Sequence, residues 1–346
     1  MSFTIDELAI PSEVTHDWRA MVRVRNEVKA EAVGNSDLAI EPDELLPRWQ
    51  NPHERKRAVV ARVDGEIVAR AVYETEDDSP AAWVSVEVLA PFRGRGIGSA
   101  LHESVVEFAR AEGKAVLQVY VTEAASTTTD VIPSPTGFGS VPRDVASSRF
   151  LVTHGYALEQ VGRMSRLDLP VDVSALRQES MDAAGPAYAL RGYLGRTPEE
   201  LLSDIAALRQ SMGTDAPSAG METESEWTAE RVRADDDAVA SSPRTWLTVI
   251  AHHVPSGEVA GYTELDIPPE RDRPVAQGDT IVLAAHRGHR LGMLLKVANI
   301  EQLEEVAPGH PAITSSNAED NTHMLAVNEA VGFVAWASLG AWKKVL

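Results

Sequence analysis

Residues 88–101 read VLAPFRGRGIGSAL, with glycine at three alternate positions. The alternating segment 83–89 before it predicts a strand, and the apolar spacing of the residues from Ile97 to Phe108 predicts a helix after it. A helix N-terminus carries unpaired N–H groups and partial positive charge, and glycines let an anion approach the backbone. The stretch therefore predicts an anion site suited to phosphate, and Arg93 and Arg95 would add charge to it.

The stretch VLAAHRGHRLGMLLK at 282–296 has the same organisation and indicates an internal duplication. Arg93 and Arg287 mark the equivalent point in each copy, and Gly155 and Gly332 mark a later helix end. The interval between these points is 17 residues longer in the first copy. The segment 127–143, rich in glycine, proline and hydroxyl residues, accounts for the difference.

Helices and strands alternate in both copies, which predicts two units of the α/β or α+β class. Each copy reads as a strand, two helices, three strands, the glycine turn, a helix, a strand, a helix and a last strand. We expect an N-terminal domain at 1–170, a linker at 171–184 and a C-terminal domain at 185–346.

The composition excludes several classes of function. The 346 residues carry a formal net charge of −20, which disfavours long contacts with nucleic acid. The absence of cysteine excludes disulfides, cysteine-ligated metals and a cysteine nucleophile, and a cytoplasmic location is the simplest expectation. We expect neither a membrane span nor a secretory leader. An acidic field attracts cationic amines, although the charge also serves solubility alone.

The glycine spacing of the first turn limits which phosphate-containing ligands it can be expected to bind. Gly94, Gly96 and Gly98 do not match the G-x-G-x-x-G dinucleotide pattern, and neither turn is followed by the Lys-Ser or Lys-Thr pair of a P-loop. The segment 93–98, RGRGIG, resembles instead the [Q/R]-x-x-G-x-[G/A] turn of the GNAT superfamily of acetyl-CoA-dependent N-acetyltransferases. The resemblance extends to the element order of both halves and implies tandem GNAT-like domains, similar in architecture to mycothiol synthase. Each domain would be a mixed, mostly antiparallel sheet flanked by helices.

The resemblance also implies which residues bind coenzyme A. The strand ends and turns would contact pantetheine and pyrophosphate, and Asn321, in the segment NAEDNTHMLAVNEAVGF, would contact the pantetheine arm. In the second turn Arg290 stands where a glycine is expected. The remaining residues implied are Val88, Leu89, Arg93, Gly94, Arg95, Gly96, Ile97, Gly98 and Ser99 in the first half, and Val282, Leu283, Arg287, Gly288, His289, Leu291 and Gly292 in the second.

Acetyl transfer to an amine needs a base, and carboxylates near the turns are the candidates. Glu87, on the strand before the first turn, is the candidate in the first half. The second half has Ile281 at that place, so Asp279 is the candidate there, with Glu264 and the terminal carboxylate of Leu346 as alternatives.

The tyrosine that commonly protonates the leaving thiolate in the family is absent from both halves. Leu151 and Asn328 occupy its positions, and Tyr120 and Tyr262 are the possible substitutes. One or both copies could therefore be catalytically degenerate.

The sequence thus predicts a cytoplasmic N-acetyltransferase that moves the acetyl group of acetyl-CoA to a small cationic amine by direct attack in a ternary complex. A non-catalytic acyl-CoA sensor or scaffold and a protein lysine acetyltransferase are the alternatives. We expect no metal, because His252 and His253 point to opposite faces of a strand and His286 and His289 lie among arginines. A monomer and a homodimer are both compatible with the sequence.

Overall fold

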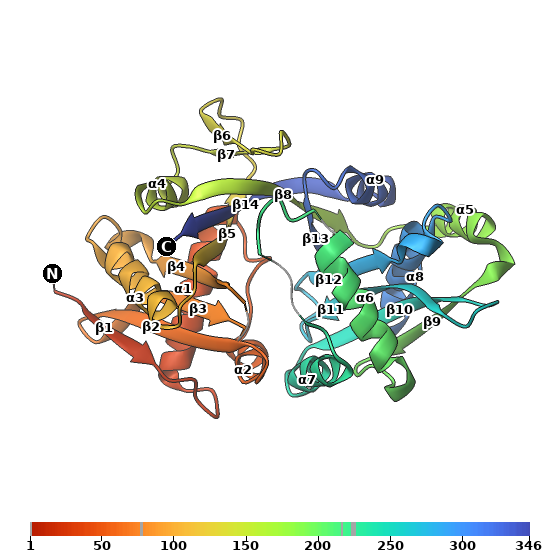
Figure 1. Cartoon of the computed structure of the whole chain (residues 1–346), viewed down its shortest axis with the longest axis horizontal. Helices are drawn as coiled ribbons and strands as arrows, with labels where there is room; N and C mark the ends of the chain where they lie inside the picture. Colours follow the sequence, from red (N-terminus) through yellow and green to blue (C-terminus); the bar gives the residue numbers. More distant parts are fainter. Residues whose placement is uncertain (1, 77–78, 216, 223–225) are drawn as a thin grey trace.

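The computed structural model describes the chain except for residues 1, 77–78, 216 and 223–225 (Figure 1). The first half contains ten main elements and a small hairpin. The main elements are β1 (Thr4–Leu8), α1 (His16–Val33), α2 (Pro42–Trp49), β2 (Arg55–Val63), β3 (Glu66–Thr75), β4 (Ala81–Val88), α3 (Ile97–Ala111), β5 (Val116–Ala124), α4 (Ala146–Thr153) and β8 (Ala157–Asp168). The hairpin of β6 (Val131–Pro133) and β7 (Ser140–Pro142) lies within the segment that makes the first copy longer.

The second half repeats this order after one additional helix. That helix, α5 (Ser174–Ala184), occupies the predicted linker. The other elements are β9 (Tyr188–Leu194), α6 (Leu202–Asp215), α7 (Ala229–Ala240), β10 (Thr245–His253), β11 (Val259–Ile267), β12 (Val275–Val282), α8 (Leu291–Val306), β13 (Ala312–Ala318), α9 (Thr322–Val331) and β14 (Val334–Val345).

Local sequence signals explain several helix ends. The Thr15 hydroxyl accepts a hydrogen bond from the backbone N–H of Trp18, 3.2 Å away, which caps α1. Gly34 ends the same helix at φ +80°, a left-handed conformation that glycine adopts without steric cost. Pro42 stands at the start of α2, where its missing N–H has no intrahelical partner to lose.

The strands form one continuous sheet in which the last strand of each half is exchanged. The order is β1-β2-β3-β4-β5-β14-β8-β13-β12-β11-β10-β9 (Figure 1). Strand β14, the end of the chain, pairs antiparallel with β5 of the first half, and β8 of the first half pairs with β13 of the second. Strands β8 and β14 also pair with each other. Each half therefore needs a strand from the other to complete its sheet, a dependence that the sequence analysis did not anticipate.

Parallel strands diverge at the same place in both halves. Strand β4 pairs with β5 over Ala81–Trp83, and β12 pairs with β13 over Val275 and Ala276. Beyond these residues, in the described part of the chain, the strands no longer pair, which leaves an opening beside the end of β4 and of β12 that leads into a glycine turn. We call these two openings the first and second splay.

Helices cover both faces of the second half's sheet, as alternate residues of β10 show. Val249 and Ala251 pack in the same cluster as the residues of α8, whereas Ile250 packs with the residues of α6. Because successive side chains of a strand point to opposite faces, α8 and α6 lie on opposite sides. A separate core fills the first half, with Trp18, Met21 and Leu101 fully buried.

The predicted mixed α/β class, with the same order of elements in the two halves, is confirmed. Two details differ from the sequence prediction. Strand β12 begins at Val275, several residues before the strand predicted at 280–284, and 158–169 forms one long strand where a pair was also considered. In the described part of the chain, no helix is long and apolar enough to cross a membrane.

Candidate functional site

The two glycine turns have nearly the same backbone conformation. Arg93 has φ/ψ of −68°/161° and Arg287 has −70°/163°. Gly94 and Gly288 follow at φ +71° and +86°. The residues that precede the helices are Gly96 at φ +82° in the first half and Arg290 at φ +55° in the second. The matching angles support the duplication that the sequence predicts.

The first arginine of each turn fastens the turn to the strand before it. Arg93 Nε donates to the carbonyl oxygen of Val88 at 2.8 Å, and Arg287 Nε donates to that of Val282 at 3.1 Å. Both terminal nitrogens of Arg93 also donate to Glu31 on α1, at 2.7 Å each. In this conformation the guanidinium of Arg93 is engaged with Val88 and Glu31, so its main role is to hold the turn in place. Its contact with pyrophosphate remains a prediction.

Both helices begin with backbone N–H groups that point into open space. Among the described residues, no side chain caps the N-terminus of α3 or α8. A Cβ added at Gly94, Gly96 or Gly292 would meet no described atom within 4 Å. Gly98 differs, because its Cβ would lie 3.3 Å from the ring of Phe150 on α4. The first three glycines thus leave room for an anion, and Gly98 allows α3 to pack closely against α4.

The second turn is more crowded than the first. Arg290 adopts a left-handed conformation that disfavours a side chain, and its guanidinium lies 3.3 Å from Glu179 of α5. Next to it, Tyr188 donates or accepts a hydrogen bond with His286 Nδ1 at 3.0 Å, and its ring contacts His289. His286 Nε2 lies 2.9 Å from Glu258. In the described part of the chain, no group of histidines and carboxylates has the arrangement of a metal site.

At the ends of β4 and β12, some backbone N–H groups are hydrogen-bonded within the sheet and others are directed away from it. The N–H of Leu89 donates to Val68 and that of Leu283 donates to Ala260, so both are engaged inside the sheet. Neighbouring residues of a strand direct their N–H groups to opposite sides. Val88 and Val282 therefore direct theirs toward the splays, and these two residues are the better candidates to contact the pantetheine arm. The engaged N–H groups of Leu89 and Leu283 were not foreseen from the sequence.

Glu87 is buried in an ion pair rather than exposed on a wet strand face. Arg70 on β3 donates to its carboxylate at 3.0 and 3.3 Å, and both side chains are less than one-tenth exposed. Burial alone would raise the pKa of Glu87, but Arg70 and then Lys29 outweigh burial and hold it below its ordinary value. Such a carboxylate is a weak proton acceptor. Glu87 remains a predicted base, although this geometry favours a structural role.

Glu123 on β5 is a second carboxylate at the first splay, and the sequence analysis did not single it out. The hydroxyl of Ser147 donates to it. Burial raises the pKa of Glu123, while Ser147 and Lys29 act in the opposite direction. Nothing in the sequence distinguishes Glu123 from other glutamates at the end of a strand. Its surroundings arise only when Lys29 of α1 and Ser147 of α4 come close to β5.

In the second half, the pair Tyr262 and Ile281 replaces Arg70 and Glu87. The register shows the equivalence, because Arg70 faces Glu87 and Tyr262 faces Ile281 across the corresponding strands. The fully buried Tyr262 donates its hydroxyl hydrogen to Asp279 at 3.0 Å. Burial and then Asp279 raise the pKa of Tyr262 well above its ordinary value. Tyr262 is therefore poorly suited to protonate a leaving thiolate.

Glu264 on β11 is the carboxylate best placed at the second splay. Its side chain passes over β12 at Gly278, where an added Cβ would lie 2.7 Å from Glu264 Cγ. Arg209 on α6 approaches it at 3.5 Å. Burial raises the pKa of Glu264 to about 7, with Arg209 lowering it and Asp279 raising it further. A base of this pKa is well matched to proton transfer near neutrality.

Three other residues that the sequence suggests for the site are Leu346, Asn321 and Tyr120. The N–H of Leu346 donates to Ala115 at 2.9 Å, so the chain end lies at the start of β5 in the first half and not at the second splay. The expectation that its carboxylate serves the second half is therefore wrong, because β14 is exchanged. The Asn321 side chain caps α9 through Met324, which leaves its predicted pantetheine contact to its amide N–H groups. Tyr120 stacks on Trp83, with ring centroids 4.7 Å apart.

Buried basic side chains occupy equivalent places beneath the two turns. His102 in α3 and Lys296 in α8 each lie five residues after the first residue of their helix. His102 shares a hydrogen bond of 3.1 Å with the hydroxyl of Tyr156, and Lys296 Nζ lies 5.7 Å from the ring of Phe333. Burial lowers the pKa of His102 to about 4 and that of Lys296 to about 7. Of these two side chains, Lys296 is therefore the one that carries partial positive charge at neutral pH.

The chain thus consists of two α/β units of the same architecture, each with a glycine turn next to a pair of separated parallel strands. Residues 21–128 match the model of the acetyltransferase (GNAT) family. This part of the first half is thus similar to that family, and the chain as a whole has the fold of a tandem GNAT protein.

Comparison of structures agrees with this assignment of the fold. A tandem GNAT protein from the clavulanic acid biosynthesis pathway is similar with a TM-score of 0.76 and 23% identity, over 99% of this chain and 98% of that chain. A GCN5-related N-acetyltransferase from Sphaerobacter thermophilus is similar with a TM-score of 0.61 and 18% identity, over 99% and 95%. Comparison with curated protein sequences gives no match.

Proposed function

We propose that the protein is an acyltransferase that transfers the acetyl group of acetyl-CoA to the primary amine of a small molecule. The observation that carries the proposal is the pair of matching turns, each at the end of a strand that has separated from its parallel neighbour. The free N–H groups of α3 and α8 suit the coenzyme's diphosphate, and each splay suits its extended pantetheine arm. The similarity of the first half to that family supports this chemistry.

We assign the chemical step to the second half. In a ternary complex the amine nitrogen attacks the thioester carbon, the C–S bond breaks, and the thiolate leaves with the bonding electrons. Glu264 accepts the proton that the amine loses, a role supported by the position of its carboxylate over Gly278 of β12, the strand that borders the second splay. The N–H of Val282 is directed at the same opening, four residues further along β12 than Gly278, where it would bind the pantetheine arm.

The first half supports a second candidate role, that of binding acyl-CoA without transfer. Its turn is the more open of the two, with glycine at both left-handed positions. Its predicted base, Glu87, is held in an ion pair. The chain would then combine a binding half with a catalytic half, and the exchanged strands β8 and β14 would connect them.

Thiol release tests the proposal. Acetyl-CoA and a panel of small amines are incubated with the protein, and free CoA is measured with a thiol-reactive dye. We expect amine-dependent release that Glu264→Gln reduces by about 10²–10⁴-fold, the usual contribution of a general base. Glu87→Gln should retain the wild-type rate per folded molecule. Tight CoA binding without release for any amine would contradict the catalytic proposal and favour the binding role. Acetylation of protein lysines alone would identify a different acceptor.

A further inference from the structure

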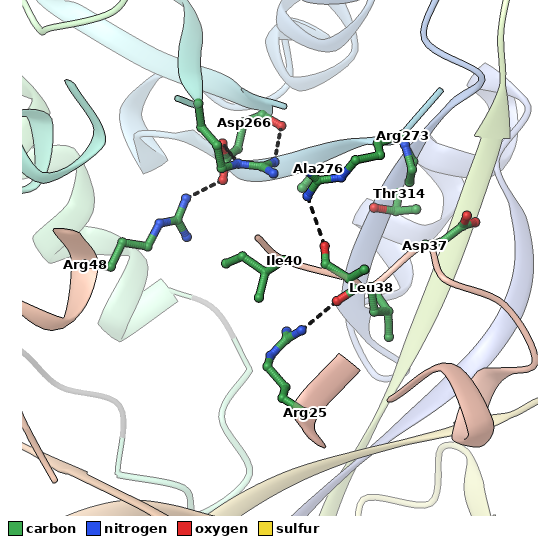
Figure 2. A pocket seen from close by; sticks show the side chains of 12 residues that line it. Arg25, Asp37, Leu38, Ile40, Arg48, Asp266, Arg273, Ala276 and Thr314 are labelled. Atoms are coloured by element: carbon green, nitrogen blue, oxygen red, sulfur yellow. Dashed lines mark hydrogen bonds and ion pairs between the residues drawn. The ribbon is translucent and has the colours of Figure 1, made fainter. Parts of the chain in front are cut away.

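A small cavity between the halves is lined by arginines from both of them (Figure 2). Its volume is about 170 Å³, below the roughly 300–1,000 Å³ of pockets for drug-sized ligands. Arg25 and Arg48 come from α1 and α2, and the loop 37–40 between these helices forms part of the wall. Arg244 and Arg273 come from the second half. The site therefore exists only when the two halves are together.

Positive charge exceeds negative charge around this cavity. Asp266 accepts from Arg48 at 2.5 Å and from Arg244 at 2.6 Å. The fully buried Glu44 accepts twice from Arg273 at 2.8 Å and once from Arg244 at 3.3 Å. Arg273 also donates to Glu270 at 2.7 Å, so these three arginines share three carboxylates. Asp37, the other acidic residue of the lining, is paired with Arg166.

Arg25 adds a further cation, on which the carboxylates of Glu87 and Glu44 act without direct contact. Its Nη1 donates to the carbonyl oxygen of Leu38 at 2.7 Å and to the amide oxygen of Asn26 at 3.0 Å, and it forms no ion pair with any residue that the structure describes. Burial and then Arg70 lower the pKa of Arg25 to about 10, which leaves it charged at neutral pH. The buried Nε of Arg48 also has no hydrogen-bond partner among the described residues. Both arginines therefore carry N–H groups that no described residue uses; that of Arg48 is buried, so Arg25 offers the accessible donors.

The cavity lies beside the second splay. Ala276 and Thr314, which line it, are the last paired residues of β12 and β13 before these strands separate. Asp266, also in the lining, is two residues from Glu264 on β11, which places the two side chains on the same face about 7 Å apart along the strand. A molecule in the cavity would extend from the arginines toward Glu264.

We propose that Arg25 and Arg48 bind a carboxylate of the acceptor, so that the substrate is a small amine that also carries a carboxylate, such as an amino acid. This inference rests on the proposed function and narrows the cationic amine expected from the sequence. Guanidinium groups bind carboxylates through paired, charge-assisted hydrogen bonds, which accounts for the surplus of arginine. The amine end of the same molecule would lie toward Glu264.

Binding measurements test the carboxylate site without relying on turnover. Calorimetry in the presence of CoA compares amino acids with amines that lack only the carboxylate, with L-lysine and cadaverine as one pair. We expect at least one amino acid to bind tenfold or more tightly than its decarboxylated partner. Arg25→Gln should remove this preference, Arg25→Lys should keep part of it, and Arg19→Gln on the exposed face of α1 should leave it unchanged.

Kinetics separate this inference from the proposed function. If the preferred amino acid is acetylated, Arg25→Gln should raise its KM about tenfold or more and change kcat little, because the carboxylate is bound away from the reacting atoms. Carboxylate-dependent binding without thiol release would refute the acetyl transfer but support the site. Equal binding within every pair, or an Arg25→Gln protein that melts normally and keeps the preference, would refute the site.

Discussion

The ion pair of Arg70 and Glu87 gives a sharp test of how the duplicated halves differ. Glu87→Gln removes the carboxylate charge from a pair whose side chains are 6% and 7% exposed. The remaining guanidinium would be buried without a counter-ion. Lys29 and Arg25 add further positive charge around the same position. We expect the variant to be strongly destabilised.

The magnitude follows from the burial of the pair. Breaking a buried pair by removing one partner costs about 3–5 kcal/mol. Unfolding entropy of roughly 2.1 cal/mol/K per residue gives about 0.7 kcal/mol/K for a chain of 346 residues, so the melting temperature should fall by about 4–7 °C. Because the pKa of Glu87 is lowered in the folded state, the pair stabilises at neutral pH and its contribution disappears as the pH falls through that pKa.

The second half supplies the matched control. Tyr262 and Ile281 occupy the equivalent positions, so the double variant Arg70→Tyr/Glu87→Ile places an uncharged pair already used by this fold at the first site. It should melt closer to the wild type than Glu87→Gln does, because a buried ion pair can be replaced by packed neutral side chains at little cost. Thermal unfolding of all three proteins would refute the reasoning if Glu87→Gln shifted the melting temperature by less than 1 °C.

Three further predictions concern the second splay, the turns and the exchanged strands. The pH profile of kcat/KM should rise through about pH 7 as Glu264 loses its proton, and Glu264→Gln should abolish this limb; an unchanged profile in the variant would count against Glu264. Gly96→Ala should destabilise the protein by about 1 kcal/mol because φ is +82°, whereas Gly292→Ala, within α8, should stabilise it by roughly 0.5–1 kcal/mol; denaturant unfolding of both would contradict this account if the signs agreed. The fragment 1–170 lacks β14, so it should be dimeric or insoluble alone and become soluble when co-expressed with 171–346; a stable monomer in size-exclusion chromatography would show that the exchange is dispensable.

The sequence predicted local structure well because its signals are local. The glycine turn, the helix caps and the hairpins depend on residues a few positions apart, and α1, α3 and β4 lie close to their predicted ranges. The equivalence of Glu87 and Ile281 was also predictable from the register of the two turns and agrees with the strand pairing.

Features that depend on tertiary contacts could not be predicted in this way. Nothing in the alternation of β14 indicates that it pairs with β5 rather than within its own half, so Leu346 was assigned to the wrong site. The burial of Glu87 in an ion pair could not be predicted, because its partner Arg70 lies on another strand. The importance of Glu264 depends on Gly278 on the adjacent strand, and the arginine-lined cavity exists only between the halves.

The most direct test of the central claim is calorimetric titration of CoA into the wild type, Gly96→Trp, Gly292→Trp and the double variant, with circular dichroism to verify folding. The two turns share one backbone conformation, so we predict two CoA molecules bound per wild-type chain, one for each single variant and none for the double variant. A folded double variant that binds CoA with the wild-type stoichiometry would contradict the claim that these turns bind the coenzyme's diphosphate.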